Sequence, residues 1–258
     1  MLSLSALSTT EFWCQYTFEN DGTTQVPLVV VLPSGRHPNA GTGQLALISD
    51  ALFTHEVVLE IDRIIRSASL GGVSLQTMLD IDYYETLERA QHSKHYPSED
   101  PLSPLNANLL LLATADINIV VQALLSQSDS YKKYGCGYAP PYEQCILVGA
   151  KKKQYPGQAY PWVGALGLYE VPWSHQKRVA IFSGGIFAVG TLAGTALLLK
   201  YLRGEERQNN RYLPTIPLKI VSATPKDYDS TILIPLHNCM PQHDLRNIDE
   251  DAGLTVHE

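Results

Sequence analysis

Three glycines and a threonine, Gly184, Gly185, Gly190 and Thr191, lie where an apolar run ends and a helical pattern begins. A turn of this kind can bind phosphate, because backbone N–H groups at the N-terminus of a helix point toward an anion. The segment GGIFAVG matches neither GxGxxG nor GxxxxGK, and no lysine follows Gly190. Two interpretations stay open for these four residues: a phosphate-holding turn, and a tight turn that lets a helix pack closely on a sheet.

A second group of polar residues, Thr114, Asp116 and Asn118, follows the apolar run NLLLLA. Open α/β sheets bind ligands at the carboxyl ends of their parallel strands, so these side chains are candidate ligand contacts. Asp and Asn are also favoured helix N-caps, and capping by Asp116 or Asn118 is the alternative interpretation.

Other reactive side chains form no recognisable catalytic set. His237, Cys239 and His243 have the spacing of a partial zinc site, but no fourth ligand is near them in the sequence. The chain has no GxSxG motif, and no cysteine has an evident histidine partner. We therefore predict no metal site and no catalytic residue, the sequence identifies no cofactor, and whether the protein is an enzyme stays open, with the absence of a catalytic set favouring a binding protein.

Composition limits the partners. The 258 residues carry a net charge of -7, and only Lys151 to Lys153 form a basic cluster, so we expect no nucleic-acid partner.

The first residues, MLSLSALSTTEFW, lack the basic region of a signal peptide, and the four cysteines suggest free thiols in a reducing compartment, so we expect a cytoplasmic protein. The longest apolar stretch, 179–202, is interrupted by glycine, serine and threonine, which predicts a strand, a turn and a helix rather than a membrane span.

The elements that must position these residues follow from apolar periodicity. Short β-branched or leucine-rich runs predict three central strands of one sheet, and apolar stripes of helical period predict helices on its faces. The strands are Val26–Leu32, Asn108–Ala113 and Arg178–Phe182, and the helices cover 50–67, 116–127 and 190–203.

Six further segments complete the pattern. We predict a strand followed by a turn or short helix over 73–87, a surface loop over 92–104, a loop over 131–144, a two-stranded antiparallel hairpin within 145–173, and closing strands over 216–223 and 230–236.

Alternation of strands and helices predicts an α/β fold with a Rossmann-like, mostly parallel sheet, helices on both faces and an antiparallel hairpin. We expect one domain over 1–237, with a possible internal boundary near 92–105, and a polar, loose tail over 238–258.

Two stretches carry a resemblance. NANLLLLATADINIVVQALL is similar to a strand and helix in the C-terminal region of archaeal S-layer-like proteins and related bacterial domains, and GALGLYEVPWSHQKRVAIFSGGIFAVGTLAGTALLLKYL resembles the later hairpin, strand, glycine turn and helix of that module. Together they span roughly residues 100 to 200, under half of the chain. The turn ATADIN departs from the family, which has a glycine-rich turn there. The resemblance implies the Rossmann-like fold and the order of strands, and no catalytic residue.

The functional expectation is a non-enzymatic binding or sensor module that recognises a small molecule or a protein partner at the carboxyl edge of its sheet. Two alternatives remain: an enzyme acting on a nucleotide-like substrate through the turn at 184–191, and a structural assembly subunit. The sequence does not indicate an oligomeric state.

Overall fold

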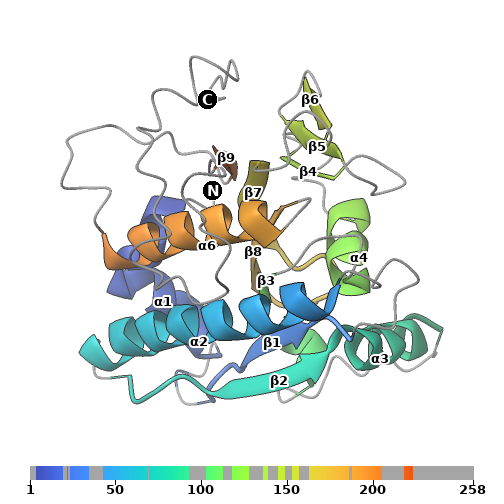
Figure 1. Cartoon of the computed structure of the whole chain (residues 1–258). Helices are drawn as coiled ribbons and strands as arrows, with labels where there is room; N and C mark the ends of the chain where they lie inside the picture. The colour runs from blue at the N-terminus through green and yellow to red at the C-terminus, as the bar shows by residue number, and fades with distance from the viewer. Residues whose placement is uncertain are drawn as a thin grey trace.

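A computed structural model describes residues 4–19, 22, 24–34, 43–68, 70–92, 103–112, 118–127, 136–138, 145–148, 153–156, 163–185, 188–204 and 218–222. Six strands form the main sheet and three short strands form a second one (Figure 1). The strands are β1 (Leu28–Leu32), β2 (Leu75–Leu79), β3 (Asn108–Leu112), β4 (Cys136–Tyr138), β5 (Cys145–Val148), β6 (Lys153–Pro156), β7 (Val163–Glu170), β8 (Val179–Gly185) and β9 (Leu218–Ser222). The helices are η1 (Leu4–Ser8), α1 (Thr10–Thr17), α2 (Gly43–Ser67), α3 (Asp80–His92), η4 (Pro104–Asn106), α4 (Ile119–Gln127) and α6 (Ala188–Arg203).

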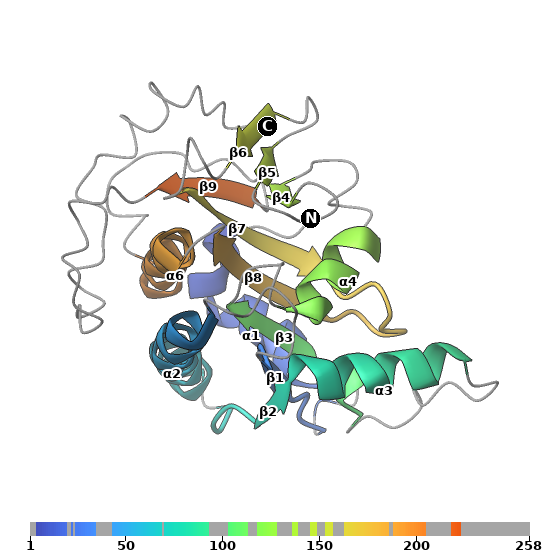
Figure 2. The same ribbon diagram turned by 45° about the vertical axis from the view of Figure 1, so that its right-hand side comes forward.

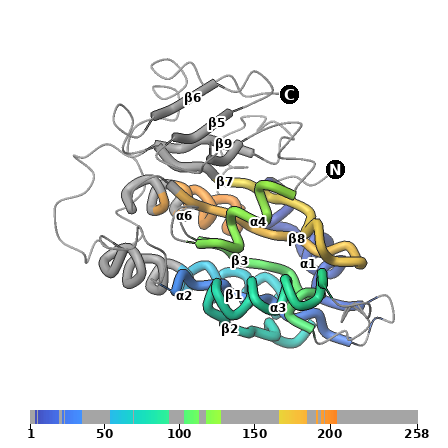
Figure 3. The backbone as a smooth tube through the Cα atoms, turned by 90° about the vertical axis from the view of Figure 1, so that its right-hand side faces the viewer, coloured from blue at the N-terminus to red at the C-terminus, as the bar shows by residue number. Residues whose placement is uncertain are grey.

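The main sheet has the strand order β2-β1-β3-β8-β7-β9. Figure 3 shows the strands from β2, at the bottom, up to β7. Strands β2, β1, β3 and β8 are parallel to one another, while β7 is antiparallel to both of its neighbours. The three predicted central strands are therefore confirmed as β1, β3 and β8, in adjacent positions of one sheet.

Alternation of side chains explains why both faces of this sheet are covered. Successive strand residues point to opposite faces, and in β1, β3 and β8 both sets are apolar. Val29, Leu109 and Phe182 belong to one buried cluster, whereas Val30, Leu110 and Ile181 belong to the other. The continuous apolar runs in the sequence thus become two cores separated by one sheet.

Helices cover the two faces in pairs. Helices α3 and α4 contribute to the cluster that contains Val29, and α2 and α6, with α1, contribute to the cluster that contains Val30. Figure 2 shows α2 and α6 side by side on one face, and α3 and α4 on the other. This arrangement confirms the α/β, Rossmann-like fold and the predicted helices, although α2 begins at Gly43 and α3 is a full helix of 13 residues.

The antiparallel part differs in detail from the prediction. Strands β5 and β6 form a hairpin, with Ile146 opposite Tyr155, and the segment from 136 to 138, expected in a loop, adds β4 to it. The next strand, β7, leaves the hairpin and pairs with β8 over seven positions. The segment expected to hold two strands therefore holds three, because strand formation depends on the available partner more than on local composition.

An N-terminal unit, η1 and α1, was not predicted. Thr9 caps α1, since its hydroxyl accepts a hydrogen bond from the Phe12 N–H, and Trp13 Nε1 donates to the Leu7 carbonyl at 2.8 Å. Leu7 and Trp13 are buried in the same cluster as α2 and α6. The unit therefore completes one of the two cores.

Several predicted features lie outside the described residues: most of the loop near 92–105, the strand at 230–236 and the tail at 238–258. The stretch 179–202 folds as β8 followed by α6, as predicted. Within the described part of the chain, no helix is both long enough and apolar enough to cross a bilayer.

Candidate functional site

The carboxyl ends of β1, β2, β3 and β8 meet at one edge of the sheet, because these strands are parallel. Strands β1 and β3 are neighbours, yet the helices that follow them, α2 and α4, pack on opposite faces. In doubly wound folds, a crevice forms where adjacent connections diverge in this way, and ligands bind there. The candidate site is therefore the carboxyl edge between β1 and β3.

Asp80 is the central polar residue of this edge. It is the first residue of α3, directly after β2, and only 4% exposed. Its Oδ1 accepts a hydrogen bond from the Ser34 N–H at 2.7 Å, and its Oδ2 accepts one from the Ile119 N–H at 3.1 Å. One carboxylate thus connects the segment leaving β1 with the start of α4.

Asn118 is the second residue of the edge, and it is fully buried. Its Oδ1 accepts hydrogen bonds from the N–H groups of Val120 (3.0 Å) and Val121 (3.2 Å), which are the bonds of a helix N-cap. Its Nδ2 donates to the Val31 carbonyl at 3.4 Å. Capping of this helix by Asn118 is confirmed, whereas Thr114 and Asp116 lie outside the described residues.

These bonds engage the N-terminus of α4. The N–H groups of Ile119, Val120 and Val121 bind the side chains of Asp80 and Asn118. A free helix N-terminus offers such groups to an anion, but here the chain's own carboxylate and amide occupy them. Phosphate recognition by these α4 groups would require the chain to give up those bonds.

The glycine turn lies on the other side of β3. Gly184 and Gly185 are the last residues of β8, opposite Ala165 and Gly164 of β7, and Gly190 and Thr191 lie in the first turns of α6. Ser183 is level with Leu112, so the two glycines extend beyond the last paired position of β3. The connection between strand and helix is thereby shorter than the turn that the sequence suggested.

Hydroxyl groups join β8 to α6 beneath this connection. Thr195 Oγ1 donates to the Thr191 carbonyl at 2.9 Å and lies 3.5 Å from Ser183 Oγ. Ser183, Thr191 and Thr195 are all buried. Close packing of α6 on the sheet accounts for these contacts.

Sequence reasoning missed Asp80, although a signal was present. The residue directly follows the alternating run LQTML, and Asp116 comes shortly after the run NLLLLA. Polar residues at the carboxyl end of every predicted parallel strand belong in the same search. The strand within 73–87 was not predicted to belong to the central sheet, so Asp80 was not among the predicted site residues.

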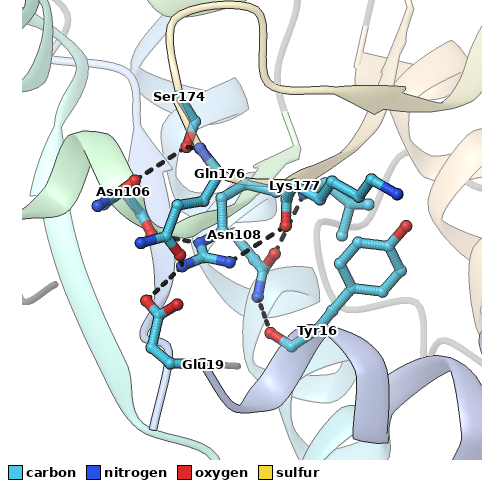
Figure 4. A network of polar contacts seen from close by, with 9 residues as sticks. Tyr16, Glu19, Asn106, Asn108, Ser174, Gln176 and Lys177 are labelled. Atoms are coloured by element: carbon cyan, nitrogen blue, oxygen red, sulfur yellow. Dashed lines mark hydrogen bonds and ion pairs between the residues drawn. The ribbon is translucent and has the colours of Figure 1, made fainter. Parts of the chain in front are cut away.

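A polar network at the opposite edge is structural (Figure 4). Arg178, just before β8, forms a buried ion pair with Glu19, and its Nε donates to the Asn106 carbonyl at 2.6 Å. Asn108 Nδ2 donates to the Tyr16 carbonyl, and its Oδ1 accepts from the Val179 N–H. The network fastens α1 and η4 to the amino ends of β3 and β8, away from the candidate site.

Among the described residues, the titratable group with the largest pKa change is Tyr83, in α3 one turn beyond Asp80. Burial raises the pKa of Tyr83 above the usual range, although the hydrogen bond that its hydroxyl accepts from Trp173 Nε1 (3.0 Å) acts in the opposite direction. Among the described residues, no cluster of three His, Cys, Asp or Glu side chains could hold a metal ion. His237, Cys239 and His243 lie outside them.

Comparison with known proteins adds no relative: no protein-family model, curated protein or solved structure matches this chain.

Proposed function

We propose that this protein is a non-enzymatic binding or sensor module that recognises a small molecule or a protein partner at the carboxyl edge between β1 and β3. The observation that carries the proposal is the divergence of α2 and α4 from two adjacent parallel strands, with Asp80 and Asn118 bonded across the point of divergence. Rigid placement of the segments around a site is what ligand recognition requires.

The chemistry of the edge favours an uncharged or cationic ligand. Asp80 contributes a buried carboxylate, and the first N–H groups of α4 already have acceptors. An anionic ligand would meet the carboxylate without gaining those N–H groups. A cytoplasmic setting is part of the proposal, and the exposed free thiol of Cys14 fits a reducing compartment.

The alternative, an enzyme acting on a nucleotide-like substrate, depends on the N-terminus of α6. Gly184 and Gly185 end β8 only a few residues before Gly190 and Thr191, so phosphate bound there would lie against backbone N–H groups. This alternative places the ligand beside β8, whereas the leading proposal places it between β1 and β3.

A thermal-shift screen tests both proposals. It should include nucleotides, cyclic nucleotides, dinucleotides, amines and neutral metabolites, because a ligand at 100 times its Kd adds about 2.7 kcal/mol of stability. Hydrogen exchange with the best ligand then locates the site: protection beside Ser34 and Asn118 supports the leading proposal, and protection confined to 183–192 supports the alternative.

Two variants sharpen the distinction. Thr191→Ala should weaken binding only if the ligand lies at α6, and Gln122→Ala, in α4 beyond the capped N-terminus, is a matched control for substitution on a helix. Failure of every ligand class to shift the melting temperature would contradict both small-molecule proposals and favour an assembly subunit.

A further inference from the structure

Strand β2 is an edge strand with an exposed apolar face. Among the described residues, no strand pairs with its outer side. Leu75, Thr77 and Leu79 are exposed, whereas Gln76 and Met78 are partly buried. Leu75 and Leu79, with Leu59 of α2, are the large hydrophobic side chains of the described chain that remain exposed, at 41 to 49%. Soluble proteins usually protect such an edge with charge, proline or a covering element.

Along β2, the backbone N–H and C=O groups of successive residues point alternately toward β1 and outward. Leu28 N–H donates to the Ser74 carbonyl, and Leu28 lies opposite Leu75 in the parallel ladder. In this pattern Ser74, Gln76 and Met78 direct their N–H and C=O groups toward β1. Leu75 and Thr77 therefore direct theirs outward, where only another strand can satisfy them as a ladder.

The sequence of β2 is complementary to itself in an antiparallel register. With Thr77 on a two-fold axis, each Leu75 lies directly opposite the Leu79 of a second copy, on the same face of the extended sheet. Thr77 of each copy then exchanges two N–H···O bonds with the other Thr77. Two exposed leucine pairs and a threonine pair meet in one register. The leucine pairs would remove apolar surface from water, and Thr–Thr is a favourable cross-strand pair.

Charge does not oppose this contact. Beside the start of β2, Arg66 is paired with Asp62, and beyond its end Glu85 is paired with Arg89, so this flanking charge is balanced within each copy. Surface pairs of this kind contribute little to stability or to association.

We propose that the outer edge of β2 binds a second copy of this chain, so that two six-stranded sheets join through an antiparallel β2–β2 ladder centred on Thr77. This interface lies on the outer side of β2, whereas the proposed ligand site lies between β1 and β3, and the interface does not depend on that site. Leu59 lies one turn before Asp62 on α2. Asp62 accepts a hydrogen bond from the N–H of Val73, two residues before Leu75, so Leu59 and Leu75 face the same side of the sheet. Leu59 extends the apolar contact beyond the strand.

The first experiment measures the mass in solution. Light scattering of the full chain should give twice 28.5 kDa at high concentration and a lower average mass on dilution. Thr77→Pro removes only an outward N–H, which an edge strand tolerates, and should yield the monomer with unchanged far-UV circular dichroism. Thr77→Val keeps the N–H and the β-branched shape, and should remain a dimer. A monomeric wild-type chain, or a dimer that survives Thr77→Pro, would overturn the proposal.

Cross-linking tests the register even if the proline variant fails to fold. Facing residues of a hydrogen-bonded antiparallel pair have Cα atoms about 5.5 Å apart, within the range of a disulfide. In a Cys14→Ser background, mild oxidation of Thr77→Cys should give a covalent dimer, with peptide mass spectrometry locating the bond at position 77 in both copies. Gln76→Cys is the control, because its side chain lies on the other face and its symmetry mate is offset by two positions. Equal cross-linking of the two variants, or none at position 77, would contradict this register.

Discussion

The carboxylate of Asp80 accepts a hydrogen bond from the backbone N–H of Ser34, 46 residues away in the sequence, with 2.7 Å between Oδ1 and the nitrogen. The same carboxylate holds the N–H of Ile119, so one side chain connects the exit of β1, the end of β2 and the start of α4. These three segments surround the point where the connections diverge. The geometry of the candidate site therefore depends on two hydrogen bonds that the Asp80 carboxylate accepts from the chain's own backbone.

Replacing Asp80 tests this dependence. Asp80→Asn removes the charge and replaces one acceptor oxygen with a donor, so a backbone N–H loses its partner in a buried place. We expect the free energy of unfolding to fall by about 1–3 kcal/mol in urea titrations. Asp82→Asn, two residues away and exposed, is the control and should change it by less than about 0.5 kcal/mol. Equal losses for the two variants would mean that the bonds of Asp80 contribute nothing specific.

The two functions of Asn118 can be separated by substitution. Asn118→Ala removes the cap of α4 and the bond to Val31, and should cost about 1–2 kcal/mol of stability. Asn118→Asp retains an acceptor for the cap but loses the donor to Val31, so its stability should lie between those of wild type and Asn118→Ala. Chemical denaturation of the three proteins gives the comparison. A variant Asn118→Asp as unstable as Asn118→Ala would show that the bond to Val31, rather than the cap, dominates.

The ion pair of Arg178 and Glu19 calls for a double-mutant cycle. Arg178→Met leaves the carboxylate of Glu19 largely buried without its cation, and should cost about 3–5 kcal/mol of unfolding free energy. Glu19→Gln should cost less, because Arg178 still donates to the Asn106 carbonyl and to Gln176. The double variant should lose less than the sum of the two single losses, by about 0.5–3 kcal/mol. Strict additivity would contradict a coupled pair.

Tyr83 should make stability fall at alkaline pH. Burial raises its pKa in the folded protein, whereas in the unfolded chain it ionises near 10. The unfolded state therefore releases a proton that the native state retains, and the stabilising contribution, complete below about pH 10, is lost as pH rises further. Between about pH 10 and 11, wild type should lose roughly 1 kcal/mol more than Tyr83→Phe in urea titrations. Parallel pH profiles for the two proteins would disprove this assignment.

Much of the fold was predictable because its signals are local. The central strands β1, β3 and β8 are continuous apolar runs, and such runs are typical of parallel strands buried on both faces. The glycine and polar breaks in 179–202 likewise separated β8 from α6, and Asn118 was placed correctly as a candidate cap. Each of these features depends on a few neighbouring residues.

Pairing and long-range bonds were decided only in three dimensions. The segment 136–138 looks like a loop and becomes β4 because β5 is available beside it, and β7 joins β8 instead of forming a hairpin with its predecessor. No local pattern shows that Asp80 meets Ser34 and Ile119, or that Arg178 meets Glu19 across 159 residues. The sequence by itself determined the apolar periodicity, and with it the class of fold and the central strands. The tertiary structure decided which strands pair, which polar groups meet and which described strands lie at the ends of the sheet, because these depend on contacts between residues far apart in the chain.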